Sequence, residues 1–422
     1  MTLSVPVALK ERREKFTNEW LWNVTMKFGP GAMVAAAFIG PGTVVTAITA
    51  GAEMGAALLW AVVFSVFATV VLQELALRTA LAADADLAQL IHRLGTGRPA
   101  GWLLIALIVM AIGVGNSAYQ SGNLTGAGLG LRAAFGWPIE WVIGFATTLG
   151  AGLIIADRYI LIERVLSALV MVMALVFVGL AIILLPDFLK QPADRLIPVF
   201  TTQSTGLVLA LIGTTVVPYN LFLHASAVRR RWQGVELDQA LHEARWDSLI
   251  AIMVGGVITL AIILVAAVLV ADVSRASAFE QLVQTVSLRF GVAGKWLVGG
   301  GLFAAGLTSA IAAPIAAGWA VAGALGWPTN AGSRGVKLIA LTVLAVGAVF
   351  ALFATRPIGL ILSAQITNAL VLPAVSAVLL LIANRAYVPA AYRNTALTNV
   401  IGCGVLLLVS VLAISKLWSL MS

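Results

Sequence analysis

A proline flanked by two glycines, Gly40-Pro41-Gly42, interrupts an otherwise continuous apolar stretch from about Gly31 to Leu59. A helix of that length would cross a bilayer, but these three residues cannot hold regular helix. Proline has no amide hydrogen and clashes with the preceding turn, while glycine adds backbone freedom. Within hydrocarbon, irregular backbone is tolerated only where it is buried in protein or lines a cavity. The tripeptide therefore predicts a binding site inside the membrane.

The composition is that of an integral membrane protein. Of 422 residues, 61% are hydrophobic and 10% are charged, whereas soluble domains carry roughly 25% charged residues. The single Cys403 excludes an intramolecular disulfide and a cysteine metal cluster, and three histidines are too few for a histidine-rich metal site. The basic residues behind the net charge of +8 lie in short loops between apolar spans. That distribution is a topology signal and argues against nucleic-acid binding.

Hydropathy predicts about eleven membrane spans, each near the roughly 20 residues that a bilayer core requires. Their approximate limits are 29–52, 56–79, 101–131, 137–156, 162–185, 203–228, 247–271, 293–325, 337–354, 358–384 and 397–420. A cytoplasmic N-terminus puts most loop arginines on the cytoplasmic side, in agreement with the positive-inside rule. We expect a multi-pass monomer of the inner membrane, with a cytoplasmic segment at 1–28 and a single transmembrane domain at 29–422.

A second break follows far downstream, in the segment from Gly213 to Asn220 that contains Pro218. The two breaks fall in spans one and six, so the second half of the chain enters the membrane with opposite polarity. This pattern is typical of an inverted repeat of five helices plus five, here about 29–185 and 203–384, with an extra helix at 397–420. Broken helices at corresponding places in two repeats indicate a transporter that works by alternating access.

The residues around both breaks resemble one known family. The first span carries Gly40-Pro41-Gly42-Thr43, and the sixth carries Thr-Thr-Val-Val-Pro-Tyr-Asn-Leu-Phe-Leu-His over 214–224. Further matches are Phe135-Gly136-Trp137-Pro138, Arg245-Trp246-Asp247-Ser248, and Gln365 eight residues before Pro373. From about Gly29 to the end of span ten the chain is similar to the Nramp family of proton-coupled metal transporters. The resemblance implies an all-α, LeuT-type inverted repeat with helices one and six broken.

The sequence departs from the family pattern at the residues that hold the metal. Nramp transporters carry an Asp-Pro-Gly-Asn motif in span one, but this chain has Gly40 and Thr43 in place of the acid and the amide. In span six the family's Ala-Thr-Val-Met-Pro-His motif supplies a backbone carbonyl and a thioether. Here Thr214, Val217 and Tyr219 replace its alanine, methionine and histidine. Compared with the family, the chain is therefore expected to lack a transition-metal site.

A divalent cation at the membrane midplane needs formal negative charge or soft donors to replace its water shell. Neither break carries a carboxylate, whereas each restarts as a helix whose free amides carry roughly half a positive charge. We therefore expect a small oxyanion, bicarbonate first, to bind between Thr43 and Thr214. A capping role for these threonines on the unwound backbone is the open alternative. The predicted substrate-binding residues are Gly40, Pro41, Gly42, Thr43, Thr214, Thr215, Val217, Tyr219, Asn220 and Gln365.

Accumulating an anion against an interior-negative potential costs about 2.3 kcal/mol per charge per 100 mV, so a driving ion is expected. The paired acids of the Nramp proton route fall on Gln120 and Asn123, which cannot carry protons in that way. In the LeuT-type fold, hydroxyls of span eight hold sodium, and the resemblance places Thr308 and Ser309 there. Helix packing is an equally good account of this pair. Sodium is the expected coupling ion, and no other cofactor is expected.

Several polar residues within spans have two open interpretations. The Nramp glutamine that matches Gln365 faces the substrate, but an interhelical hydrogen bond would also explain it. Asn116, Gln120 and Asn123 recur at spacings of four and three on one face of span three. They line an aqueous path or join helices. The sequence leaves open whether they, or Glu74 near the inner end of span two, take part in transport.

Two other functional classes compete with an anion carrier. A carrier of divalent metal such as Mn²⁺ or Mg²⁺, coupled to protons, is what family membership alone suggests, and it would hold the cation through hydroxyls, carbonyls and retained water. The other is a sensor that has the fold of a transporter but transports no substrate. No nucleophile, base and acid come together in the pattern, so we do not expect an enzyme.

Overall fold

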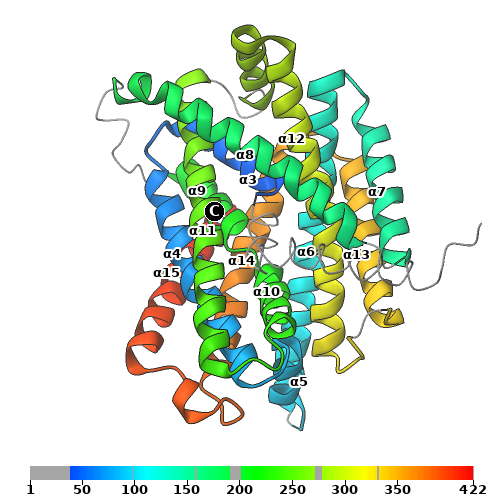
Figure 1. The fold of residues 1–422 in the computed structure, drawn as a ribbon, viewed down its shortest axis with the longest axis vertical. Helices are drawn as coiled ribbons and strands as arrows, with labels where there is room; N and C mark the ends of the chain where they lie inside the picture. The colour runs from blue at the N-terminus through cyan, green and yellow to red at the C-terminus, as the bar shows by residue number, and fades with distance from the viewer. Residues whose placement is uncertain are drawn as a thin grey trace, which may run out of the picture.

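The computed structural model describes residues 39–97, 99–156, 159–190, 201–270, 278–329 and 332–421. The expected cytoplasmic segment 1–28 and the start of the first span lie outside these residues. The described part is α-helical, with one short 3-10 helix, η2 (Ala390–Tyr392) (Figure 1). The helices are α3 (Pro41–Met54), α4 (Leu59–Ala82), α5 (Leu87–Gly95), α6 (Pro99–Phe135), α7 (Ile139–Ala156), α8 (Tyr159–Leu189), α9 (Thr202–Thr215), α10 (Pro218–Arg231), α11 (Leu237–Leu269), α12 (Ala278–Ala324), α13 (Arg334–Leu352), α14 (Pro357–Ala383) and α15 (Ala396–Met421).

Hydropathy located most of the spans to within a few residues. Among the described residues, ten helical segments are long and apolar enough to cross a membrane, with α9 and α10 together forming one of them. Helix α11 extends further than predicted: it starts at Leu237, where the Glu236 carboxylate accepts hydrogen bonds from the Asp238 and Gln239 amides. Helix α12 starts at Ala278, but Gly291 (φ 66°) leaves the helical conformation inside it, so the predicted start of span eight at 293 lies directly after this break. Hydropathy finds the apolar part of a helix, so it misses polar turns that continue beyond the membrane.

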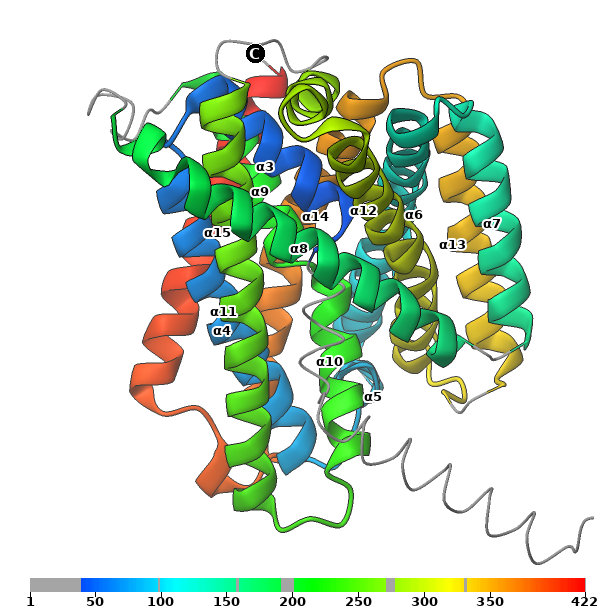
Figure 2. The ribbon, with the colours of Figure 1, turned by 45° about the horizontal axis from the view of Figure 1, so that its top comes forward.

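Helices α6 and α12 pack along much of their length, and small residues let their backbones approach closely. A Cβ placed on Gly306 of α12 would lie 2.5 Å from the Ala127 amide nitrogen of α6. Lipid is as apolar as leucine, so helix association in a membrane depends on such close packing and on interhelical hydrogen bonds. Helices α7 and α13 pack beside this pair at one edge of the bundle (Figure 2).

Helix α14 has a central place, because it contacts α3, α4, α6 and α9. Helices α3 and α9 pack against each other in the same half of the molecule, and α10 continues from α9 into the other half (Figures 1 and 2). Helix α15 packs outside this group, against α14. The start of α3 and the junction of α9 with α10 therefore meet at mid-height, beside α14.

Candidate functional site

The described chain is non-helical at both predicted breaks, and proline sets where the following helix starts. Gly40 has extended backbone (φ −78°, ψ 174°), and α3 begins at Pro41. Helix α9 ends at Thr215, and the non-helical Val216 and Val217 precede Pro218, the first residue of α10. Proline fits the first turn of a helix because its missing amide hydrogen has no partner there. The same residue that breaks each span therefore starts its second half.

The two breaks touch through the side chains of Thr43 and Thr214. Their hydroxyl oxygens lie 2.8 Å apart and share a hydrogen bond, although 171 positions separate them in the chain. Both side chains are fully buried. The structure thus brings together the two residues between which substrate was expected, but it places them in direct contact. An ion would enter between these hydroxyls only after α3 and α9 separate.

Gln365 of α14 lies against both breaks, because glycine at each leaves room for it. A Cβ on Gly42 would lie 2.2 Å from the Gln365 amide nitrogen, and a Cβ on Gly213 would lie 1.9 Å from the Gln365 carbonyl oxygen. The Gln365 side chain is fully buried, and neither its Oε1 nor its Nε2 has a hydrogen-bond partner. A buried, unpartnered carboxamide costs roughly 1–3 kcal/mol per group. Gln365 therefore has unused hydrogen-bonding capacity at the centre of the protein.

The remaining predicted residues divide between this centre and the surrounding helices. Asn220, 2% exposed, also has a carboxamide without partners. The Thr215 hydroxyl instead donates to Leu211 O of its own helix. Val217 and Tyr219 belong to an apolar cluster that includes Tyr119 of α6, a residue that the sequence analysis did not single out. Helical spacing could have found Tyr119, because it lies on the same face of span three as Asn116 and Asn123.

The polar face of α6 joins helices. Gln120 Nε2 donates to Ala310 O of α12 at 3.0 Å, and Asn116 Nδ2 makes a longer contact of 3.5 Å with Ala313 O of α12. Asn123 Nδ2 donates to Gln120 Oε1 at 3.4 Å. These bonds supply the interhelical attraction that small-residue packing between α6 and α12 needs.

The expected sodium residues lie on α12. The Thr308 hydroxyl donates to Ala304 O in the preceding turn, so it acts within its own helix. The Ser309 hydroxyl is fully buried and has no hydrogen-bond partner. Both hydroxyl oxygens keep lone pairs for an ion, and that of Ser309 makes no hydrogen bond.

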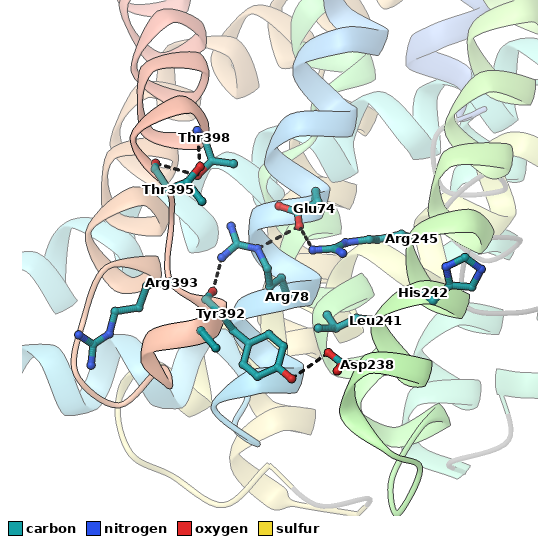
Figure 3. A pocket seen from close by; sticks show the side chains of 11 residues that line it. Glu74, Arg78, Asp238, Leu241, His242, Arg245, Tyr392, Arg393, Thr395 and Thr398 are labelled. Carbon is teal, nitrogen blue, oxygen red and sulfur yellow. Dashed lines mark hydrogen bonds and ion pairs between the residues drawn. The ribbon is translucent and has the colours of Figure 1, made fainter.

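Glu74 takes part in a charged cluster with residues of α4 and α11 (Figure 3). Its carboxylate pairs with Arg78 of α4 at 2.9 Å and with Arg245 of α11 at 2.7 Å. Arg78 also donates to Tyr392 O, and the Tyr392 hydroxyl donates to Asp238 at 2.8 Å. These contacts border a cavity of about 420 Å³ and tie α4 and α11 to the connection between α14 and α15. The Arg78 guanidinium is fully engaged by protein groups, so Glu74 and Arg78 serve as a structural clamp.

Comparison with known proteins assigns the family. Residues 31–419 match the family described as natural resistance-associated macrophage protein-like, or Nramp. This chain belongs to the Nramp family. The divalent metal cation transporter MntH of Xylella fastidiosa strain 9a5c is 30% identical over 373 residues, which cover 84% of this chain and 76% of the relative. The MntH of Mycobacterium tuberculosis strain H37Rv is 29% identical over 71% of this chain and 70% of its own.

Solved structures agree on the fold. The manganese transporter of Eremococcus coleocola, crystallised with an aromatic bis-isothiourea compound, superposes with a TM-score of 0.72 over 93% of this Nramp chain and 86% of its own, at 23% identity. A nucleobase-cation-symport-1 family transporter superposes with a TM-score of 0.56 at 13% identity, over 92% of each chain. The prediction of an all-α, LeuT-type membrane protein with two broken helices is confirmed.

The expectation of bicarbonate or another small anion as substrate is wrong. The curated Nramp relatives are divalent metal cation transporters, and the similar solved structures of the family are manganese transporters. The expectation of an anion considered only the partial positive charge of the helix starts at the breaks. The C-terminal end of α9 meets the start of α10 at the same point and presents carbonyl oxygens with about half a negative charge. Proline at the start of α3 and of α10 also removes one amide donor from each.

A double-mutant cycle tests the hydrogen bond between the two breaks. We expect Thr43→Val and Thr214→Val each to lower the free energy of unfolding in detergent by about 1–2 kcal/mol, because each removes one partner of a buried hydroxyl pair. The double variant should cost less than the two single changes together, by about 1 kcal/mol. Strict additivity of the three unfolding free energies would show that the hydroxyls do not interact.

Proposed function

We propose that this Nramp protein is a secondary transporter that carries a divalent metal cation of the hard, oxygen-binding kind, Mn²⁺ or Mg²⁺. The observation that carries the proposal is Gln365: its buried carboxamide lies against Gly42 at the first break with no partner for its oxygen, and its main chain lies against Gly213 near the second break. The curated relatives of the chain, which carry divalent metal cations, support the same class of substrate.

The donors near the breaks suit a cation that keeps part of its water. Among the described residues, no three His, Cys, Asp or Glu side chains come together as a metal site. The available oxygens are therefore neutral: Gln365 Oε1, Asn220 Oδ1, the Thr43 and Thr214 hydroxyls and the last carbonyls of α9. Mg²⁺ dehydrates reluctantly and usually retains several waters, and Mn²⁺ accepts the same oxygen donors. Such a site disfavours metals that need thiolate or imidazole ligands.

Alternating access requires the contact between Thr43 and Thr214 to open. We propose the inverted repeats at about 29–185 and 203–384 as the units that move relative to each other. The molecule's arginine-rich end, where Arg78, Arg229 and Arg245 lie, is proposed to face the cytoplasm, with the N-terminus on the same side and the protein in the inner membrane.

We propose sodium as the coupling ion, at the Ser309 hydroxyl. Helix α12, which carries Ser309, packs against α3, the helix that starts at the first break. Replacing external sodium with choline should slow metal uptake several-fold, and Ser309→Ala should remove that dependence. Equal uptake in sodium and choline would reject sodium coupling, and a pH gradient in the same vesicles would then test proton coupling.

Uptake by purified protein in liposomes tests the substrate. We expect saturable uptake of radioactive Mn²⁺, inhibited by excess Mg²⁺, and none in protein-free liposomes. Gln365→Leu should lower the uptake, whereas Gln239→Leu, at an exposed amide on the outer turns of α11, should leave it unchanged. Absence of Mn²⁺ and Mg²⁺ flux in liposomes with folded protein would refute the proposal.

A further inference from the structure

Directly beyond the second break, on the side of the arginine-rich end, a buried aromatic cluster joins α10 to α6 and α12. We call it the tyrosine plug, and its members are Tyr119, Val217, Tyr219, Leu223, Ala313 and Ala316, with Trp319 packed at its edge. The rings of Tyr119 and Tyr219 have centroids 5.5 Å apart and an interplanar angle of 59°. Both tyrosines are fully buried. The plug therefore fills the space between α10 and the α6–α12 pair.

The far end of α10 is held by charged contacts. The Arg230 guanidinium lies 4.7 Å from the ring centroid of Trp319 on α12, in cation–π geometry. Arg229 pairs with Asp84 at 2.9 Å and with Asp86 at 3.6 Å, in the link between α4 and α5. Each of these contacts is partly exposed, and partly exposed contacts of this kind are modest in strength. They hold α10 in place, but a small change in free energy is enough to break them.

Helix α10 also has a hinge. Val216 (φ −97°, ψ 75°) and Val217 (φ −82°, ψ 119°) leave the helical conformation between α9 and Pro218. A few residues at the end of an element are enough to absorb the rotation of a rigid helix. Helix α10 can therefore turn about Val216 and Val217 while α9 stays packed against α3 and α14.

The buried hydroxyls of the tyrosine plug make a contribution to the free energy that opposes its closed state. The hydroxyls of Tyr119 and Tyr219 are buried and interact at most with each other, so at least one O–H of the pair lacks an acceptor. Burying a hydroxyl without a partner is unfavourable, and water would satisfy both groups once α10 moves away. Ring packing and the contact between Arg230 and Trp319 thus favour a closed plug, while hydration of two phenols favours an open one. Two states with opposing contributions of this kind are what a gate requires.

We propose that the tyrosine plug is the gate between the two breaks and the arginine-rich end, with Arg230 on Trp319 as its latch. This proposal rests on the proposed transport function only for the direction of cargo movement. The ring and the hydroxyl of each tyrosine should have opposite effects on the opening of this gate. Loss of the ring should open the gate, and loss of the hydroxyl alone should keep it closed longer.

Cysteine labelling tests the gate without any cargo. Cys403 is the only cysteine in the chain, so Cys403→Ser gives a cysteine-free background. Thr215→Cys then places a reporter at a position that is 1% exposed, on the side of the plug that faces the breaks. The measurement is the rate of labelling by a membrane-impermeant, positively charged thiosulfonate, applied to membranes whose arginine-rich end faces the reagent.

We expect Tyr219→Ala and Trp319→Ala to raise the labelling rate more than about tenfold, because each leaves a cavity in the plug. Tyr219→Phe should lower the rate severalfold, since it removes a buried hydroxyl of an incompletely bonded pair and keeps the ring. Arg230→Ala should raise it about three- to fivefold, as expected for the loss of one partly exposed cation–π contact. Arg231→Ala is the matched control, because Arg231 lies over Trp232, the residue that ends its own helix, and should leave the rate unchanged.

Gel filtration of each variant shows whether it is folded. If Tyr219→Ala does not fold, Tyr219→Phe and the Arg230 and Arg231 pair still decide the question. Parent-like labelling in both Tyr219→Phe and Arg230→Ala would overturn the gate, as would equal effects of Arg230→Ala and Arg231→Ala. Labelling that follows the prediction in a protein without Mn²⁺ flux would support the gate and refute only the proposed cargo.

Discussion

Gly213→Ala should abolish most transport and lower stability. The new methyl carbon would lie 1.9 Å from the Gln365 carbonyl oxygen and 2.9 Å from the Ala369 amide nitrogen, both of them main-chain atoms of α14. Backbone cannot rotate away as a side chain can, so α9 and α14 must separate by about 1.5 Å to reach ordinary contact near 3.4 Å. Overpacking of this kind costs about 1–3 kcal/mol. It would also move Gln365 off the breaks, so we expect metal uptake to fall more than about tenfold.

The matched control for this change is Gly144→Ala on α7, where a Cβ meets nothing within 4 Å. Alanine favours helix over glycine by about 0.8–1.0 kcal/mol, so this variant should be as stable as the parent or slightly more stable. Thermal unfolding in detergent and initial uptake rates in liposomes give the two readouts. Parent-like uptake by Gly213→Ala would show that the close approach of α9 and α14 is unimportant.

Two substitutions of Gln365 by side chains of similar size should affect Mn²⁺ binding differently. Gln365→Leu removes the carboxamide oxygen and should lower the uptake efficiency for Mn²⁺ about 10- to 100-fold, the range seen when groups that support a metal are removed. Gln365→Glu adds a carboxylate against the first break and should preserve binding or strengthen it, because hard divalent cations prefer charged oxygen. Removing an unpartnered amide should also leave the Leu variant at least as stable as the parent.

The pair of variants separates a role in binding from a role in packing. Calorimetry with Mn²⁺ on both proteins measures affinity directly, and thermal unfolding measures stability. Weaker binding with unchanged stability in Gln365→Leu would place the residue in the cation site. If the Leu variant binds as the parent does and the Glu variant loses binding, then Gln365 is not a cation ligand.

Much of the fold was predictable because its signals are local. Pro41 and Pro218 cannot occupy the interior of a helix, so each marks a break wherever the rest of the chain goes. Apolar stretches near 20 residues identify spans for the same reason, since backbone in lipid must form its hydrogen bonds within the segment. The start of α11 was missed because its outer turns are polar.

The roles of the polar residues could not be predicted in the same way, because they depend on partners far away in the sequence. Glu74 was undecided from sequence, and its partner Arg245 lies 171 positions away. Tyr119 gains its significance from Tyr219, 100 positions later in the chain. The charge preferred at the breaks was misjudged for a related reason. It depends on where the carbonyl end of α9 and the Gln365 oxygen lie relative to the helix starts, and a list of residues does not contain those directions.

The amino-acid sequence by itself determined the number and approximate limits of the spans, the two broken helices and the family, because each follows from backbone chemistry or from short motifs. Only the tertiary structure decided that Thr43 contacts Thr214 and that Gln365 lies against Gly42 and Gly213. It also decided that Tyr119 of α6 packs against Tyr219 of α10. Contacts between residues far apart in the chain depend on how whole helices pack, and packing is settled by all of their contacts together.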